Sequence, residues 1–555
     1  ILYSMMMGTA VLTGTTSCVS DLDQYPHTET TSKDVYTSLA NYEAVLGKIY
    51  AAMVTSGQGK GGDNKDMESV LNGGSGFDYM RMFINMQECG TDEFASTWLT
   101  GEQTTGLTYL SWDANDAWVS DMYYRIYYNI ALCNEFLRNA NNANFSGADA
   151  EKMKEYKAEV RFMRALFYYH ALDFYRNIPM VTENDPVGSY IPPRYTPQQT
   201  FDYIESELKD CVGDMLPAST CPYGQASQGA AYTLLAKLYL NSEVYTGVAK
   251  YAECMEACKK VMDMGYSLES DYSKLFNADN DKRTNEIIFA LPVSAEHTVS
   301  WGSSTYLVCG QLSMSNANQN VADYGVTAGW SEFRLRPEFV DKFTQTDIDG
   351  NGDKRCKFFT NGQSKDISSM TTETAGYLSE KWSNLKDDKT TASNTADAGV
   401  ETDFPLFRLA DVYLMYAECV ARTVEDKDKL DDWAGGSDAE SDSRKQGAIY
   451  WINKVRERAY GKDENGNPKG QVWKENFSSK DAFLQFILDE RARELYHEGY
   501  RRTDLIRYGQ FTTNKYIWQW KGGTHDGQAV DSKYNIYPIP NTELTANPNL
   551  HNDNY

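Results

Sequence analysis

Four side chains near the C-terminus have the types and spacing of an acid/base catalytic group. Glu490, Glu494, His497 and Glu498 fall on one face of a helix with 3.6 residues per turn. Carboxylates and an imidazole grouped in this way could donate and accept protons during a hydrolytic reaction. One hypothesis is therefore a reaction centre within residues 489–509.

The opposite stripe of the same helix supports a second interpretation. It consists of Leu484, Leu488, Arg491 and Leu495, so an arginine stands in an otherwise apolar row. Because burying an unpaired guanidinium is costly, Arg491 must pair with a carboxylate. The cluster would then be an ion-pair network that locks the fold, and this segment alone does not decide between the two hypotheses.

Three aromatic residues lie in segments without an apolar period. Trp98 stands in TDEFASTWLTGEQ, Tyr306 in WGSSTYLVCG and Trp330 in VTAGWSEF. Gly, Ser and Thr flank each ring, which is not typical of a core element. A flat ring beside hydroxyl and amide groups suits a sugar, whose C–H face stacks on the ring while its hydroxyls form hydrogen bonds. These segments predict a carbohydrate site, and buried packing is the alternative for each ring.

Other site motifs are missing from the sequence. It contains no Gly-rich phosphate loop, no zinc-ligand spacing and no nucleophile elbow. Residues 347–353 resemble the first half of a calcium loop, but Phe358 stands where that loop needs a bidentate Glu, so we interpret them as a turn. Cys211 and Cys221 are the nearest cysteines separated by a loop and could form a disulfide.

The chain is long and strongly acidic. Its 555 residues carry a net charge of −25 at pH 7, and the pI is about 4.7. A surface of this charge repels nucleic acids and anionic lipid headgroups and disfavours acidic polysaccharides. Neutral ligands are compatible with the composition.

The N-terminal segment has features of an export signal. Residues 1–17 contain a short apolar run that ends in small residues, and no later segment is apolar enough to cross a bilayer. Ser17 directly before Cys18 resembles a lipoprotein signal, in which Cys18 becomes the acylated first residue. We therefore expect residues 1–17 to be an incomplete signal peptide and Cys18 to be a lipid anchor. An ordinary cleaved signal, with Cys18 incidental, is the alternative.

Helical periodicity dominates the rest of the chain. Apolar residues recur at every third or fourth position in segments 34–54, 114–139, 151–175, 197–216, 230–245, 249–264, 404–423, 443–460 and 480–498. The small and aromatic residues of 230–264 have the spacing of a tetratricopeptide hairpin. Residues 77–112 and 266–402 lack a sustained period, so we expect functional loops in the first and a loop-rich insertion in the second.

The predicted fold class is mainly α. We expect a tetratricopeptide-repeat helical scaffold with a large loop-rich insertion, folded as a single domain over 18–555. Its parts would be N-terminal helical repeats at 18–265, the insertion at 266–402, and C-terminal helices with an aromatic tail at 403–555.

Several longer segments resemble one known family. They are VSDLD after Cys18, AEVRFMRALFYYHALDFYRNIPMV at 158–181, DFPLFRLADVYLMYAE at 403–418, LDERARELYHEGYRRTDLIRYGQFTTNKYIWQWKGG at 488–523 and YPIPNTELTANPNL at 537–550. By these segments the chain resembles the SusD/RagB family over essentially its whole mature length. The resemblance implies a surface lipoprotein with a tetratricopeptide scaffold that binds glycans, is not an enzyme, and lies as a lid over a SusC-type TonB-dependent outer-membrane transporter.

The resemblance also implies site residues. Matched motif to motif, the glycan-binding set is Arg81, Trp98, Tyr306 and Trp330. Two positions depart from the starch-binding members, because Ser96 replaces the first Trp of a WxW pair and Gly101 replaces an Asn. The aromatic arc is then incomplete, and Trp301 or Tyr109 could complete it.

Some members of the family bind calcium. The matching candidates here are Asp279, Asp281, Glu401 and Asp403. No other cofactor is implied. In a family without enzymatic activity, the cluster at 489–509 is better interpreted as scaffold than as a reaction centre.

The expected function is that of a cell-surface, lipid-anchored outer-membrane protein. It would capture neutral oligosaccharides, with starch-like maltooligosaccharides favoured, and deliver them to the SusC-type transporter. Three alternatives stay open: a different neutral polysaccharide such as a fructan, a glycoside hydrolase with two carboxylates, and a pure protein-interaction scaffold.

Overall fold

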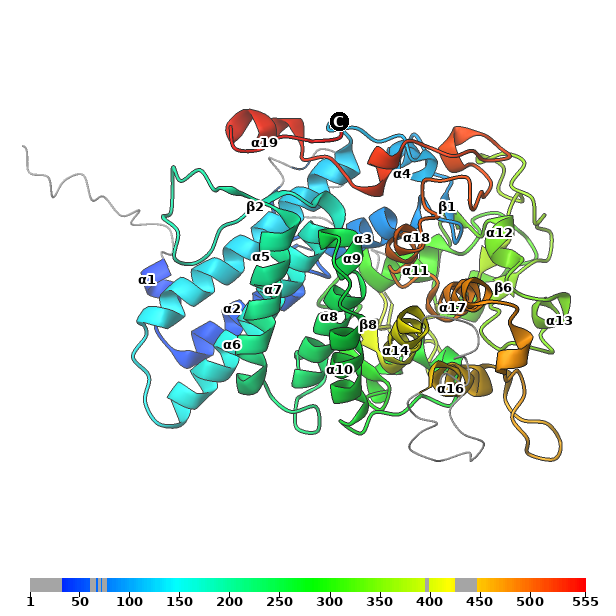
Figure 1. The fold of residues 1–555 in the computed structure, drawn as a ribbon, viewed down its shortest axis with the longest axis horizontal. Helices are drawn as coiled ribbons and strands as arrows, with labels where there is room; N and C mark the ends of the chain where they lie inside the picture. The colour runs from blue at the N-terminus through cyan, green and yellow to red at the C-terminus, as the bar shows by residue number, and fades with distance from the viewer. Residues whose placement is uncertain (1–31, 60–65, 68–70, 72–76, 395–398, 425–446) are drawn as a thin grey trace, which may run out of the picture.

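The computed structural model describes residues 32–59, 66–67, 71, 77–394, 399–424 and 447–555. Cys18 and the whole of the predicted signal segment therefore lie outside the described residues. Long helices of the N-terminal half fill one side of the molecule, and the other side combines the C-terminal helices with short helices, short strands and long loops (Figure 1). The prediction of a mainly α fold is confirmed.

The long helices of the N-terminal half pack side by side in an array. Their bounds are α1 Ser32–Val35, α2 Leu39–Ala51, α3 Tyr79–Glu88, α4 Thr105–Tyr109, α5 Ala117–Asn142, α6 Ala148–Tyr175, α7 Pro197–Cys211, α8 Gln228–Leu240, α9 Ser242–Thr246 and α10 Tyr251–Met262. Helix α6 packs between α5 and α7, and α10 packs on α8 (Figure 1).

The C-terminal helices continue this array. They are α14 Leu409–Thr423, α16 Ala448–Tyr460, α17 Lys480–Leu495, α18 Arg501–Arg507 and α19 Asn541–Ala546, and α14 packs on α10, α16 and α17. The loop-rich part contains the short helices α11 Ser303–Gly310, α12 Pro337–Val340 and α13 Gln345–Ile348.

The described strands pair into small antiparallel ladders. The pairs are β1 Ala95–Ser96 with β5 Phe333–Arg334, β2 Ile178–Pro179 with β3 Arg194–Tyr195, β4 Ile287–Leu291 with β8 Phe404–Arg408, and β6 Phe358–Phe359 with β7 Leu378–Ser379. Each ladder joins segments that are distant in the sequence or closes a long loop. They therefore fix the loops relative to the helices.

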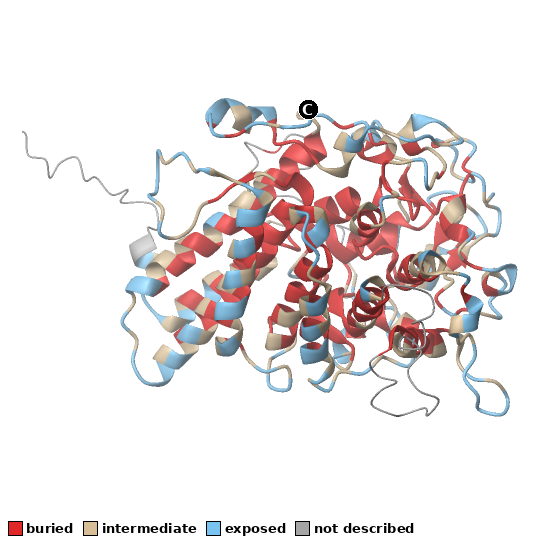
Figure 2. Cartoon of the chain, viewed as in Figure 1, coloured by how far each residue is buried: buried red, intermediate tan, exposed pale blue. Residues whose placement is uncertain are grey.

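Local signals explain why the long helices begin where they do. The Asp116 carboxylate accepts hydrogen bonds from the backbone N–H groups of Trp118 and Val119 and so caps α5. Thr196 and Gln199 form a reciprocal capping box at the start of α7, with Pro197 in the first turn. The apolar stripe of α6 is buried against its neighbours, as its period predicts (Figure 2).

Three expectations about secondary structure were wrong. Residues 77–112 are not all loop, because α3 lies inside them with every one of its residues buried. Its polar residues Arg81, Asn85 and Glu88 do recur at helical spacing, but this period spans only ten residues and is not sustained. The first five residues of the predicted helix 404–423 form strand β8, and α17 ends at Leu495 rather than at Glu498, before the positive φ angles of His497 and Gly499.

The helical and loop-rich parts share one hydrophobic core. One continuous buried core contains side chains from Tyr42 near the start of the described chain to Leu550 near its end.

No helix in the described ranges combines the length and apolar character needed to cross a membrane. All cysteines within those ranges are free thiols, so the predicted disulfide between Cys211 and Cys221 is not formed.

Candidate functional site

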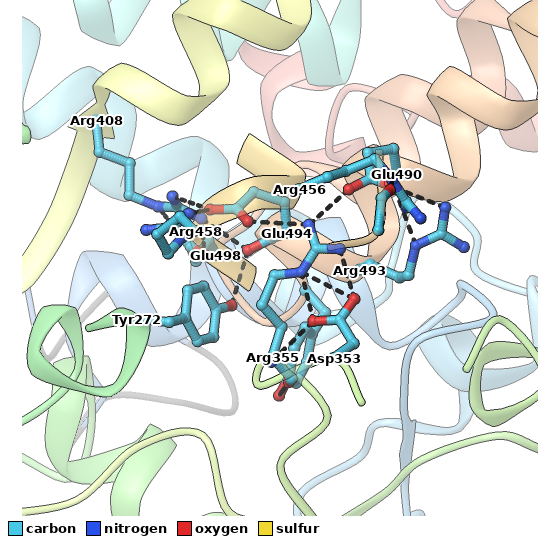
Figure 3. Close-up of polar contacts among 12 residues, drawn as sticks. Tyr272, Asp353, Arg355, Arg408, Arg456, Arg458, Glu490, Arg493, Glu494 and Glu498 are labelled. Carbon is cyan, nitrogen blue, oxygen red and sulfur yellow. Dashed lines mark hydrogen bonds and ion pairs between the residues drawn. The ribbon is translucent and has the colours of Figure 1, made fainter. Parts of the chain in front are cut away.

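The carboxylate cluster at the end of α17 is buried and fully paired. Glu490 lies 2.7 Å from Arg355 and 2.6 Å from Arg456, and both carboxylate oxygens of Glu494 contact arginines (Figure 3). Glu498 lies 2.7 Å from Arg408 and 2.6 Å from Lys381. The cluster is therefore an internal network of ion pairs.

Its ionisation states do not suit proton transfer. Burial would raise the pKa of Glu494, but Arg458, Arg408 and Arg355 outweigh that effect and lower the pKa to about 2. Burial lowers the pKa of His497 well below its usual value, and in the described part of the chain neither ring nitrogen has a hydrogen-bond partner. A carboxylate fixed as the anion and a neutral, enclosed imidazole make no acid/base pair, so the hypothesis of a reaction centre was wrong.

Arg491 has the pairing that its apolar surroundings predict. Its guanidinium is 2 % exposed and lies 2.8 Å from Asp411 and 2.7 Å from Asp504. These carboxylates come from α14 and α18, so Arg491 joins three helices.

Glu88 and Glu93 form a buried pair of carboxyl groups next to this network. Glu88 accepts a hydrogen bond of 2.8 Å from the backbone N–H of Gly499. Burial raises the pKa of Glu88 to about 7. Burial, followed by the neighbouring charge of Glu88, raises the pKa of Glu93 well above its usual value. The folded pair thus holds a proton that an unfolded chain would release.

This proton makes stability depend on pH. In the unfolded chain a Glu side chain loses its proton near pH 4.3. The stability that the protonated pair contributes is therefore complete below about pH 4.3, and it is lost as pH rises through the pKa values of the folded protein. We expect Glu93→Gln, which stays neutral, to gain stability relative to the native protein between about pH 5 and 8 in urea unfolding. Exposed Glu253→Gln is the control, and equal pH profiles for Glu93→Gln and the native protein would contradict the assignment.

The predicted site residue Trp330 and the alternative Trp301 come together at the surface, and the segment of Trp98 lies beside that of Trp330. Trp98 follows β1, Trp330 precedes β5, and Trp301 precedes α11. The rings of Trp301 and Trp330 have centroids 6.0 Å apart at an interplanar angle of 47°, and Trp301 is 37 % exposed. The hydroxyl of Thr97 donates to the Ser331 carbonyl at 2.8 Å, which holds the Trp98 segment beside that of Trp330.

The paired rings of Trp301 and Trp330 wall a shallow pocket. Its volume is about 40 Å³, and its other lining residues are Thr305, Cys309, Val326, Thr327, Ala328, Asn394, Gly399 and Val400. Aromatic faces beside hydroxyl and amide groups match the polar and apolar faces of a sugar. The pocket is too small to enclose an oligosaccharide, so a ligand would lie across it.

Arg81 lies beneath the rings and not on the surface. Its side chain is 2 % exposed, donates to the Trp301 carbonyl at 2.7 Å, and lies 2.8 Å from Glu332. It also pairs with Glu102, which follows Trp98 by four residues. One guanidinium therefore ties together the three segments that carry the tryptophans, and the expectation that Arg81 contacts sugar directly is corrected to a positioning role.

Helix α3 reinforces this arrangement at its first turn. Asp78 caps the helix by accepting from the Arg81 backbone N–H at 2.8 Å, and it also accepts from the Ser300 hydroxyl at 2.5 Å and the Ser303 N–H at 3.1 Å. Those serines flank Trp301. Helix α3, which is buried along its whole length, is thus the base of the site.

Tyr306 is inside the protein. Its ring is 0 % exposed, and its hydroxyl lies 2.6 Å from the side-chain oxygen of Asn85 and 3.0 Å from a carboxyl oxygen of Glu332, so its one proton is donated to one of them at a time. The prediction that it stacks on sugar was wrong, because α11 turns this ring inward over Arg81, 4.3 Å from the guanidinium carbon. The serines and threonine around Tyr306 are themselves buried, so their polarity was misleading.

The structure also shows the surroundings of Ser96 and Gly101, where the sequence departs from the starch-binding members, and of Tyr109, the other candidate to complete the arc. Ser96 is buried and accepts from Thr104, so it leaves no room for an exposed ring, whereas a Cβ at Gly101 would meet nothing within 4 Å. Tyr109 stacks on Trp520 at 6.0 Å and does not complete the arc. Trp301, which contacts Trp330, is the residue that completes the arc.

The four calcium candidates do not converge on one point. In the described residues no group of three or more carboxylate, histidine or cysteine side chains could hold a metal ion. Asp279 pairs with Lys282, and Glu401 accepts from the Ala295 N–H at 3.0 Å. Asp403 accepts from Tyr223 at 2.7 Å, and burial raises its pKa to about 7. The described residues therefore show no metal-holding group at Asp279, Asp281, Glu401 and Asp403, although the charges of Asp281 and Glu401 lie near Asp403.

Comparison with known proteins gives one consistent result. Residues 349–555 match the model of the SusD family, and residues 22–240 match a model described as starch-binding, associating with outer membrane. The starch-binding protein SusD of Bacteroides thetaiotaomicron is 32% identical over 99% of this chain and 97% of its own length.

Solved structures share the fold. A SusD-like carbohydrate-binding protein from Bacteroides fragilis has a TM-score of 0.68 at 18% identity, over 93% of this chain and 100% of its own. A laminarin-binding SusD-like protein has a TM-score of 0.64 at 20% identity, over 93% of this chain and 99% of its own. These relatives are carbohydrate-binding proteins rather than enzymes. By its full-length similarity and both family models, the chain belongs to the SusD/RagB family.

Proposed function

We propose that this protein captures neutral oligosaccharides of the starch type at the cell surface. In this proposal it is anchored to the outer membrane through acylated Cys18 and passes its ligand to a SusC-type TonB-dependent transporter. The observation that carries the proposal is the pair of Trp301 and Trp330, with Trp98 on a neighbouring segment, all three on segments fixed by Arg81. The relative named as starch-binding is similar over its full length, which favours an α-glucan.

The arrangement suits binding of a sugar without catalysis. The rings of Trp301 and Trp330 would stack on the C–H faces of successive sugars, and Thr327 and Asn394 would bond their hydroxyls. Since the rings are held before a ligand arrives, binding loses little entropy in ordering them. A shallow site gives weak binding per contact, so affinity for a polymer would depend on repeated contacts.

Trp330→Ala tests this site. We expect its affinity for maltoheptaose to fall by roughly thirtyfold, or about 2 kcal/mol, in isothermal calorimetry, because the variant removes one central stacking surface. Trp473→Ala is the matched control, since Trp473 is exposed to 41% and belongs to none of the three segments.

The outcomes separate the alternatives. Equal affinities of Trp330→Ala and the native protein would exclude this site. Binding of the native protein to levan but not to maltoheptaose would keep the site and change the glycan. Release of shorter sugars during incubation would indicate a hydrolase instead.

A further inference from the structure

Two carboxyl groups beneath the tryptophans share one cation. Glu102 and Glu332 both accept from the same nitrogen of Arg81, Nη2, and the distance from that nitrogen to Glu332 is 2.8 Å. The two carboxyl groups also lie within hydrogen-bond reach of each other. The side chain of Glu332 is 0% exposed and that of Glu102 is 13% exposed. One guanidinium therefore faces two carboxyl groups, and Glu102 is the one that reaches water.

Burial keeps a proton on this pair near neutral pH. It raises the pKa of Glu332 to about 8, although the charge of Arg81 acts in the opposite direction. With that proton, one carboxyl group donates to the other, and the pair together with Arg81 has no net charge. Without it, two negative charges face one positive charge and repel each other.

The other titratable groups around Glu332 do not change charge near pH 8. Burial raises the pKa of the Tyr306 hydroxyl on α11 and of the Cys89 thiol at the end of α3 well above their usual values, so both stay neutral. Asp78, at the start of α3, accepts from three donors, which favour its anion. Glu332 is therefore the group of this cluster that changes charge as pH rises through about 8.

Both carboxyl groups are joined to the Trp98 segment through the backbone. The Glu102 N–H donates to the Trp98 carbonyl at 3.2 Å, which closes a single turn. The Glu332 carbonyl accepts from the Thr97 N–H at 2.6 Å. Since Glu102 can turn toward water and Glu332 cannot, repulsion between the two displaces Glu102, and the turn that begins at Trp98 moves with it.

We propose that the Glu102–Glu332 pair is a pH-sensitive switch that sets the glycan affinity of the tryptophan site. While the pair holds its proton, Glu102 stays on Arg81 and Trp98 is positioned for the sugar. Once both carboxyl groups are charged, Glu102 leaves Arg81 and Trp98 loses its position. The inference rests on the proposed function, because the switch regulates binding of the same glycan.

The direction of the pH effect follows from the raised pKa of Glu332. Its proton is present below about pH 7 and is lost as pH rises through about 8, so affinity is complete at the lower pH and falls at the higher one. Trp301 and Trp330 keep their contact with each other, so part of the affinity remains at high pH.

Isothermal calorimetry with maltoheptaose between about pH 6.5 and 9.5, at constant ionic strength, measures the switch. We expect the affinity of the native protein to fall roughly fivefold over this range, because the fraction of molecules with Trp98 in position falls. Glu332→Gln keeps a neutral group that accepts from Arg81 and donates to Glu102, so its affinity should stay at the native low-pH value throughout. Glu102→Gln removes the repulsion from the other side and should give the same flat profile, and it decides the test if Glu332→Gln does not fold.

Two further variants separate the switch from a general effect of pH. Trp98→Ala should bind more weakly than the native protein at the lowest pH and lose the pH dependence, because the switch acts through that ring. Glu159→Gln is the matched control, since Glu159 is a buried carboxyl group on α6 whose pKa burial raises to about 7, and it accepts from Tyr50 at 2.7 Å. Its variant should follow the native profile, and thermal unfolding at each pH verifies that every protein remains folded.

Failure of the switch and failure of the proposed function give different results. A native affinity that does not change with pH, or profiles of Glu332→Gln and Glu102→Gln that fall as the native profile does, would overturn the switch and leave the tryptophan site intact. A Trp98→Ala variant with the full native pH dependence would overturn the switch as well, because the effect would not act through that ring. A native protein that binds maltoheptaose at no pH would overturn the proposed function and this inference with it.

Discussion

Replacement of Arg81 by methionine should reduce affinity for maltoheptaose by roughly 100-fold or more, a larger loss than any single tryptophan substitution gives. The guanidinium holds the Trp301 carbonyl, Glu332 and Glu102, so its removal releases all three ring-bearing segments. Burial raises the pKa of Glu332 to about 8, so this carboxyl can take up a proton when its cation is lost. The variant should therefore remain folded.

Acrylamide quenching of tryptophan fluorescence without sugar separates positioning from direct contact. Released rings are more accessible, so quenching should increase in Arg81→Met, whereas loss of a mere sugar contact would not change it. Arg164→Met is the matched control, because Arg164 is equally buried and pairs with Glu183 and Glu207. Arg164→Met should lose stability but keep affinity, and a folded Arg81→Met with native affinity and quenching would contradict the positioning role.

Arg491→Ala should cost about 3 kcal/mol or more of unfolding free energy, because it leaves buried carboxylates with fewer cations. Asp411 keeps Lys237 at 3.1 Å and Asp504 keeps Arg507 at 2.8 Å, which limits the loss. Urea unfolding measures it, with an unchanged slope expected. Affinity for maltoheptaose in the folded fraction should equal that of the native protein.

A surface pair provides the scale for that loss. Lys365 pairs with Asp341 at an exposed position, with side chains exposed to 40% and 64%. Lys365→Ala should therefore cost less than about 1 kcal/mol. A similarly small cost for Arg491→Ala would show that the buried network contributes little net stability.

The sequence predicted the long helices, whose period is sustained, and missed a short one. The stripe of α6 and the need of Arg491 for a carboxylate follow from one apolar face, so both were predictable. Helix α3 has a helical period of only ten residues and is buried on every face. The family resemblance named Arg81 as a sugar contact, so its supporting role and the contribution of Asp78 were missed.

The errors at single residues share a physical cause. Tyr306 was judged by its neighbours in sequence and the calcium candidates by the family resemblance, whereas the direction of a side chain and the partners it already has decide what it can do. The Tyr306 hydroxyl already has Asn85 and Glu332, and Asp403 already has Tyr223. Such partners lie far away in the chain, and a single sequence carries no record of those pairings.

The ion pairs of the C-terminal helices have a consequence for the order of folding. Arg501 binds Asp92 across 409 residues of sequence, and Arg502 binds Asp173 across 329. Until residues 489–509 have been synthesised, the N-terminal half retains buried acids without their cations. Contacts of such separation form late and slowly. The nascent chain therefore stays incompletely folded until its end is available, a state compatible with export as an unfolded polypeptide.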